Sequence, residues 1–328
     1  MGHWPGFIMH TLLRRMFYAV LMGLIFACPA GALPIQTDDE ILRDFMWSRF
    51  TSLPQQQRPK IGLALSAGGV RGFAHVGVLE VLDNAGVPID MLAGTSMGSV
   101  VGSLYAAGLP TEKLWEISDH MSFEQITPDF NVMGLFRFLF AQKLPSSANL
   151  VNFFHEQIGD MRFEDLKTPF TCSAMDIKTG ERVVFNSGPL AIAVRASMNI
   201  PGVFEPVQYR HRALVDGAVV DYLPVESVKL MGADYIIASV TPPDFASTTP
   251  QSVAAYLLRV GDVRGAAMIE ESSQKANFVL TNRVLDTGTL ELDKLHKAGE
   301  VGIKEANRHL GELQEDILLF TLPYVFKP

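Results

Sequence analysis

The sequence is poor in cysteine and in charge, and it has neither internal repeats nor low-complexity tracts. Two cysteines in 328 residues exclude a protein built on a disulfide framework. Only 19% of the residues are charged, and 35 acidic residues outnumber 27 basic ones, so a protein that follows nucleic-acid phosphates is not expected. The 48% of hydrophobic residues excludes a disordered chain and suffices for a large buried core.

The start of the chain has the pattern of an export signal. The first 15 residues carry two arginines and no acidic residue, the apolar run Met16–Phe26 follows, and an Ala-x-Ala sequence ends at Ala32. This order predicts a secretory signal peptide over residues 1–32 and hence an exported protein, periplasmic or secreted.

Two alternatives to signal cleavage remain open. Residues 16–33 reach the lower length limit of a membrane span, so an uncleaved leader would anchor the protein. Lipidation at Cys28 is the other alternative.

Cleavage after Ala32 would leave Cys172 as the only cysteine. Its strand-like surroundings favour a small buried side chain over a nucleophile.

The rest of the chain divides into a linker, one domain and a tail. Residues 33–58 are polar and rich in turn formers, and they are predicted to be a linker with one short helix over 38–50. One domain is predicted over 59–315, followed by a tail at 316–328.

The domain begins with alternating strands and helices. Strands are predicted at 61–65 and 91–93, each followed by a helix, at 73–85 and 98–107. Near-continuous apolar strands that alternate with helices are typical of a parallel sheet covered on both faces, so the predicted class is α/β. The other expected elements are helices at 111–120, 149–159, 190–197, 253–275 and 292–313, and strands at 170–174, 182–185, 234–240 and 278–284.

The segment Gly94–Gly98 has the pattern G-x-S-x-G between a predicted strand and a predicted helix. A tight strand-to-helix turn strains its central residue, and glycines two positions away make room for that turn. Ser96 would therefore stand clear of the backbone at the positive end of a helix, where it can act as a nucleophile. The alternative is a structural turn with an idle serine.

A second glycine-rich segment, Ala67–Gly72, directly follows the first strand and opens a helix. Glycines expose backbone N–H groups, which can stabilise the oxyanion of an acyl-transfer reaction. The competing interpretation is a dinucleotide-binding loop, G-x-G-x-x-G. It is disfavoured because Ala67 replaces the first glycine and no acidic residue ends the second strand.

The base that would activate the serine is predicted to be Asp216. The histidines that follow it, His296 and His309, both lie in the predicted closing helix, where a histidine is usually only solvated. Asp216 instead follows a strand-like segment and precedes Gly217. The alternative is an ordinary turn aspartate, which an Asp-Gly pair favours.

Four ordered blocks together resemble the patatin-like phospholipase family, in its bacterial, exported form. They are Leu65–Gly72, Gly94–Gly98, Ala196–Pro206 and Asp216–Ala218. The resemblance covers most of the predicted domain and implies a three-layer α/β/α patatin-like fold with a mostly parallel central sheet.

The resemblance also implies a Ser–Asp catalytic dyad that cleaves fatty-acyl esters through an acyl-enzyme intermediate. Ser96 would be the nucleophile and Asp216 the proton acceptor. The residues implied for the oxyanion hole are Gly68, Gly69, Val70 and Met97, those for support of the loop are Arg71 and Gly72, and those of the nucleophile elbow are Gly94 and Gly98. Ala67 departs from the family's usual first glycine but still supplies an N–H group. His75 is expected to be a core histidine.

The expected activity is that of a phospholipase A or lysophospholipase on a phospholipid or another acyl ester. The alternatives are a short-chain esterase or thioesterase with the same dyad, and a non-catalytic lipid-binding protein.

The aromatic segment 130–140 is a candidate for transient membrane contact; the alternative is an ordinary helix that packs on the sheet. No metal or other cofactor is expected, because no calcium loop, zinc cluster or P-loop is present. Head group, acyl length and oligomeric state stay open.

Overall fold

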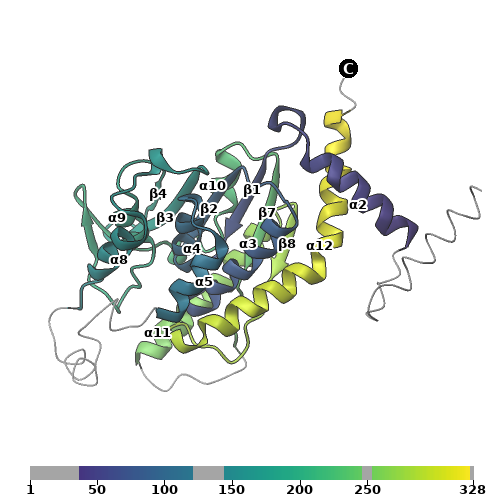
Figure 1. Cartoon of the computed structure of the whole chain (residues 1–328). Helices are drawn as coiled ribbons and strands as arrows, with labels where there is room; N and C mark the ends of the chain where they lie inside the picture. Colours follow the sequence, from purple (N-terminus) through teal and green to yellow (C-terminus); the bar gives the residue numbers. More distant parts are fainter. Residues whose placement is uncertain (1–36, 121–143, 246–252, 326–328) are drawn as a thin grey trace, which may run out of the picture. The chain divides into compact units, whose positions relative to one another are not determined.

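The computed structural model describes residues 37–120, 144–245 and 253–325 (Figure 1). The predicted signal peptide at 1–32 and the aromatic segment 130–140 lie outside these ranges, so both stay predictions. In the described ranges, no helix combines the length and apolarity needed to cross a bilayer.

Contacts divide the chain into two units, with the boundary between Phe45 and Met46. The described part of the first unit is the start of helix α2 (Asp38–Thr51). Thr37 and Glu40 form a capping box there: the Glu40 carboxylate accepts the Thr37 N–H at 2.7 Å, and the Thr37 hydroxyl accepts the Glu40 N–H at 3.3 Å. This cap explains why a helix begins in a polar linker.

One mixed sheet of eight strands forms the centre of the second unit in the described residues, in the order β5-β6-β3-β2-β1-β7-β8, with β4 also paired to β3. The strands paired in parallel are β1 (Ile61–Leu65), β2 (Met91–Thr95), β3 (Phe170–Asp176), β7 (Tyr235–Val240) and β8 (Phe278–Thr281). The antiparallel strands are β4 (Arg182–Phe185), β5 (Val207–Tyr209) and β6 (Arg212–Asp216).

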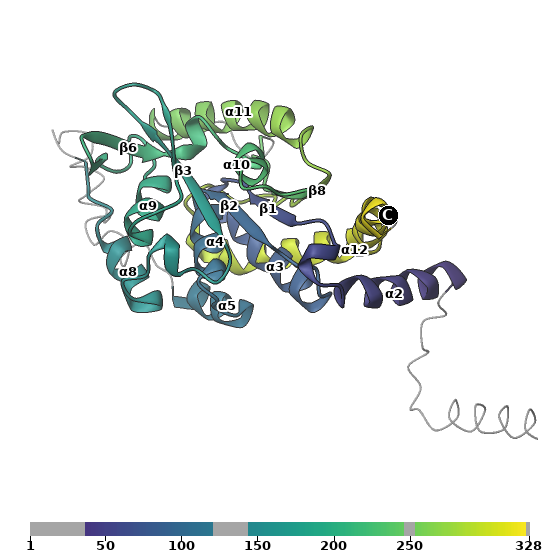
Figure 2. The ribbon, with the colours of Figure 1, turned by 90° about the horizontal axis from the view of Figure 1, so that it is seen from above.

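Helices cover both faces of this sheet (Figure 2). Successive residues of a strand point to opposite faces of the sheet and so belong to two hydrophobic cores. Leu63 and Leu92 pack in the larger core, and Ala64 and Ala93 pack in the smaller one. The larger core is covered by α3 (Ala74–Asn84), α4 (Met97–Ala106), α5 (Thr111–His120), α8 (Asn149–Ile158), α9 (Leu190–Ser197) and α12 (Leu295–Val325). The other face carries α10 (Val225–Leu230) and α11 (Val253–Ser273). The predicted three-layer α/β/α class is confirmed.

The sequence-based boundaries were wrong at the end of the chain. Helix α12 continues to Val325, through most of the segment 316–328 that was predicted to be a tail. The helix continues because Ile317 and Thr321 are buried and Phe320 packs against the larger core. Strand β5 and helix α10 were not predicted, since both are too short to show a clear period.

Candidate active site

The ends of two strands meet on β3. Ser173 of β3 pairs with Thr95, the last residue of β2, and the next residue, Ala174, pairs with Asp216, the last residue of β6. Because β4 occupies the opposite edge of β3 at Cys172–Met175, β2 and β6 lie along the same edge and run toward each other. This register brings Asp216 beside the residue that follows Thr95, across 120 residues of sequence.

That residue is Ser96, which has a strained backbone at the start of α4. Its φ of 54° lies in the left-handed region that side chains other than glycine rarely adopt. The flanking glycines permit the tight turn: a Cβ on Gly94 would lie 2.2 Å from the Gly98 carbonyl oxygen, and one on Gly98 would lie 2.5 Å from that of Leu65. The turn therefore holds the serine at the positive end of the helix, as its motif predicts.

The Ser96 hydroxyl donates a hydrogen bond of 2.7 Å to Oδ2 of Asp216. The other carboxylate oxygen accepts the Ala218 N–H at 2.8 Å, and the Asp216 N–H donates to the Asn199 carbonyl at 2.9 Å. Burial raises the pKa of Asp216 to about 7, against the opposing effect of the Ala218 and Ser96 hydrogen bonds. The Ser96 hydroxyl is therefore hydrogen-bonded to a carboxyl group whose pKa lies close to neutral pH.

The glycine-rich loop lies next to this pair. Gly69 and Met97 each begin a helical element, so their N–H groups have no acceptor within that element, and both residues line a pocket with Ser96. Gly69 has a φ of 55°, and a Cβ there would lie 2.3 Å from the Thr289 carbonyl oxygen. The Val70 N–H already donates to that carbonyl at 3.0 Å, so in this structure Val70 holds the loop and its N–H is engaged.

Arg71 and Gly72 lie where they can support the loop. The buried guanidinium of Arg71 donates to Asp262 of α11 at 3.0 Å and to the Thr287 carbonyl at 3.3 Å. A Cβ on Gly72 would lie 2.7 Å from Cβ of Met97, so glycine allows the loop to approach the start of α4.

Two polar residues near the pair had no role in the sequence analysis. The Ser197 hydroxyl accepts the Ser96 N–H at 3.0 Å. Asn199, fully buried, donates to the Glu205 carbonyl at 2.9 Å and accepts from the Ser147 hydroxyl at 2.6 Å. Both residues lie in the block Ala196–Pro206, which supplied the resemblance but no hint of these contacts.

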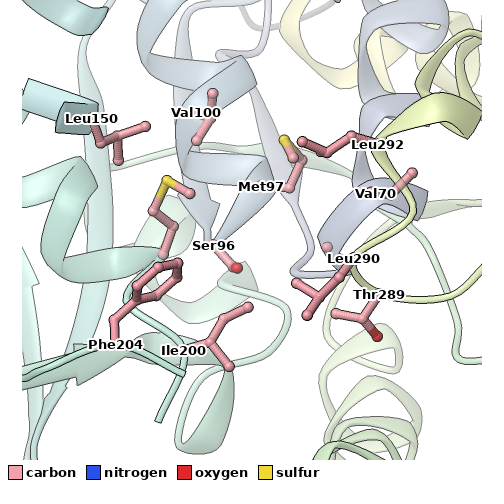
Figure 3. Close-up of a pocket in the computed structure, with 12 residues that line it drawn as sticks. Val70, Ser96, Met97, Val100, Leu150, Ile200, Phe204, Thr289, Leu290 and Leu292 are labelled. Carbon is pink, nitrogen blue, oxygen red and sulfur yellow. The ribbon is translucent and has the colours of Figure 1, made fainter. Parts of the chain in front are cut away.

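An apolar pocket opens beside the Ser96 hydroxyl (Figure 3). It encloses roughly 580 Å³ of space, solvent at its mouth included. Its walls come from distant parts of the chain, which in Figure 3 surround the serine hydroxyl. Among the lining side chains are Val70, Val100, Leu150, Ile200, Phe204 and Leu290. An apolar lining of this kind is typical of pockets that bind hydrocarbon groups.

The other candidate residues lie elsewhere. His75 is buried, as expected, and its ring nitrogens lie 2.8 Å from the Ser239 hydroxyl and 2.9 Å from the Ser66 carbonyl. His296 pairs with Asp119, and Cys172 is buried, which raises the pKa of its thiol. In the described part of the chain, no group of three or more His, Cys, Asp or Glu side chains is arranged to hold a metal ion.

Comparisons with known proteins indicate the family of the chain. The family model of the patatin-like phospholipases matches residues 63–229. An uncharacterized NTE family protein of Mycobacterium bovis is 36% identical over 183 residues, which cover 55% of this chain and 48% of the relative. The lysophospholipase NTE1 of Pyricularia oryzae is 26% identical over 78% of this chain and 19% of its own length. The chain thus spans about half or less of these relatives.

Among solved structures, the human GIVD cytosolic phospholipase A2 is similar in fold. It superposes with a TM-score of 0.50 at 11% sequence identity, over 88% of this chain and 65% of that one.

Proposed function

Because the chain belongs to the patatin-like phospholipase family, we propose that it is a serine lipid acyl hydrolase of the phospholipase A or lysophospholipase type. The observation that carries the proposal is the 2.7 Å hydrogen bond from the Ser96 hydroxyl to Asp216 at the wall of an apolar pocket. The name of the fungal relative, a lysophospholipase, supports a lipid substrate.

In the first half of the proposed reaction, Ser96 attacks the ester carbonyl carbon while its proton passes to Oδ2 of Asp216. The carbonyl oxygen becomes negative and accepts hydrogen bonds from the N–H groups of Gly68, Gly69 and Met97. The ester C–O bond then breaks, and Asp216 returns the proton to the leaving alcohol. The acyl group stays bound to the serine oxygen, with its hydrocarbon chain in the pocket.

In the second half, Asp216 takes a proton from a water molecule whose oxygen attacks the acyl carbonyl. The second oxyanion occupies the same site, the bond to the serine oxygen breaks, and the proton on Asp216 returns to Ser96. A fatty acid leaves. A carboxyl group with a pKa near 7 suits both steps, since it accepts and returns a proton at similar cost.

The test is fatty-acid release from phospholipid and lysophospholipid by the purified chain, compared with folded Ser96→Ala and Asp216→Asn variants. The proposal predicts release by the native chain and a loss of orders of magnitude in both variants. Full activity of Ser96→Ala would remove the assigned nucleophile. Activity only on short esters or thioesters would favour the esterase alternative, and inactivity on all substrates would favour a lipid-binding protein.

We also propose that the protein is exported through residues 1–32, on the sequence pattern alone. The intact mass of the protein recovered after expression in a secreting bacterium tests this. A chain beginning at Leu33 supports cleavage, a full-length membrane-bound chain supports an anchor, and a lipid adduct on Cys28 supports lipidation.

A further inference from the structure

Helix α11 carries an apolar stripe on its outward face. Tyr256, Leu257, Val260 and Val263 are each between 57% and 64% exposed. Their spacing places them within about a third of the helix circumference. The opposite side of α11 packs on the protein through Gly265, whose position against the Tyr222 ring leaves no room for a Cβ.

This stripe lies close to the catalytic pair. Asp262 of α11 holds Arg71, which belongs to the same turn as Gly69. The 3-10 turn that directly follows Asp216 packs against α11, and Val219 at its end is exposed. Helix α11 therefore flanks both the glycine-rich loop and the strand end that supplies the base.

The loop after β8 is linked to α11 through Arg71 and also lines the pocket. Its exposed Leu285 lies two residues before Thr287, whose carbonyl accepts from the Arg71 guanidinium that also holds α11. Farther along, Thr289 and Leu290 line the pocket. The loop after β8 thus carries an exposed apolar side chain at Leu285 and, a few residues farther on, forms part of the pocket wall.

Charged residues set the limits of this surface. Arg264 is exposed on the stripe itself, and the guanidinium of Arg259 stacks on the exposed Phe245 ring at 5.6 Å. About two turns farther along α11, the exposed Glu270 and Glu271 end the apolar stretch. Apolar side chains with arginines among them match the boundary between acyl chains and phosphate head groups.

We propose that the outward face of α11 from Tyr256 to Arg264, with Phe245, Val219 and Leu285, is the surface that docks on a lipid bilayer. The inference rests on the proposed function, because the docked protein would draw an acyl chain from the bilayer into the pocket beside Ser96. The chain has a formal net charge of −8, so apolar contact rather than long-range attraction drives the docking. We therefore expect the protein to dock in high salt and on zwitterionic phosphatidylcholine, which has no net charge.

A position-specific probe tests the surface without interference from the leader. In a Cys28→Ser background, where Cys172 is buried, Val260→Cys is labelled with an environment-sensitive fluorophore. The matched control is Leu319→Cys on α12, equally exposed at 65%. Leu319 lies near Asp316, which bonds Tyr235 at the first residue of β7, and so at the end of the sheet opposite the catalytic pair.

The label at position 260 is expected to shift to the blue on phosphatidylcholine vesicles and to be quenched by lipid-borne quenchers, whereas the label at 319 does neither. An unchanged label at 260 overturns the proposal. So does a shift that needs only higher protein concentration, since a second copy of the chain would then cover the face.

A second measurement connects docking to turnover. Leu257→Asp with Val260→Asp should lower hydrolysis of vesicle phospholipid, relative to hydrolysis of a monomeric short-chain ester, by about tenfold or more. Leu319→Asp should leave this ratio unchanged. An unchanged ratio in the double variant contradicts the docking surface even if the enzyme is active. A label that responds to vesicles in a protein without any hydrolysis contradicts the proposed function and leaves the docking surface in place.

Discussion

Among the described residues, two buried pairs of a serine hydroxyl and a titratable side chain differ in their surroundings: one lines a pocket and the other is enclosed by the core. Ser96 lies 2.7 Å from Asp216, and Ser239 lies 2.8 Å from His75. By residue type alone, the serine and histidine would be the more familiar catalytic couple. Ser239, however, sits in a regular strand, also accepts from the Asn282 amide at 3.0 Å, and is fully buried.

The two pairs differ in access and in backbone strain, and both features support the proposal that Ser96 is the nucleophile. Ser96 has a positive φ and lines an apolar pocket, whereas Ser239 and His75 are enclosed by the core. Burial acts on both titratable partners: it raises the pKa of Asp216 to about 7 and lowers that of His75 to about 4. At neutral pH the histidine is a neutral core side chain, and the aspartate is close to its titration point.

Substitution of the two serines should have the largest effect and should distinguish the two pairs. Ser96→Ala is expected to lower kcat for ester hydrolysis by at least about 1,000-fold, because it removes the covalent route. Ser239→Ala should stay within about threefold of the native value, since Ser239 does not reach the pocket. Turnover of a short-chain ester by both purified variants measures this. Equal losses in the two would mean that the pairs are not functionally distinct.

Substitutions of the two titratable partners, Asp216 and His75, should have the next largest difference in their effect on kcat. Asp216→Asn keeps an oxygen for the Ala218 N–H but loses the base, so kcat should fall about 100- to 10,000-fold. His75→Gln keeps hydrogen-bonding capacity in the core and should leave kcat nearly unchanged. Circular dichroism spectra that match the native chain would show that the variants are folded. A larger activity loss in His75→Gln than in Asp216→Asn would reverse the assignment of the base.

The pH dependence of kcat/KM should follow the pKa of Asp216 and not that of His75. Only the ionised carboxylate can accept the serine proton, so kcat/KM should fall as the pH drops through about 7, by about tenfold per unit well below it. His75, with its pKa near 4, contributes no inflection between pH 5 and 8. A rate profile in the native chain and in His75→Gln tests this. An inflection near neutrality that disappears in His75→Gln would contradict the account.

The smallest expected effect is on the free energy of unfolding, which should depend on pH with opposite signs for Asp216 and His75. The folded-state pKa of Asp216 is raised, so the folded state gains from its protonated form, and that gain is lost as the pH rises from about 4 through about 7. The folded-state pKa of His75 is lowered, so its contribution is complete above the unfolded value and is lost as the pH falls toward 4.

Asp216→Asn is therefore expected to raise the free energy of unfolding at pH 8 by about 1–3 kcal/mol and to change it little at pH 4. His75→Gln should lower it at pH 8 by about 1–3 kcal/mol, through hydrogen bonds lost in the core. Urea unfolding at both pH values measures these changes. Destabilisation of Asp216→Asn at pH 8 would mean that burial does not raise the pKa of Asp216.

The sequence was informative where local geometry dictates residue type. A sharp turn needs the glycines around Ser96, and an Asp-Gly step follows β6, so both members of the pair could be predicted. Their meeting on β3 could not, because it depends on the register of strands far apart in the chain. The contacts of Gly69 and Val70 with Thr289 are likewise set by tertiary packing, and no local pattern marks that threonine.

The end of the last helix could not be predicted from the sequence either. The closing helix is predicted to end at residue 313, yet Ile317 is buried and α12 continues to Val325. Burial against the core outweighs a weak local preference.

Covalent labelling by a long-chain alkyl fluorophosphonate, followed by intact mass measurement and peptide mapping, tests whether Ser96 is the nucleophile. We expect one adduct per chain, on the peptide that contains Ser96, with no adduct on Ser239 and much slower labelling of Asp216→Asn. A folded native chain that forms no adduct, or forms it on another residue, would contradict the assignment of Ser96 as the nucleophile.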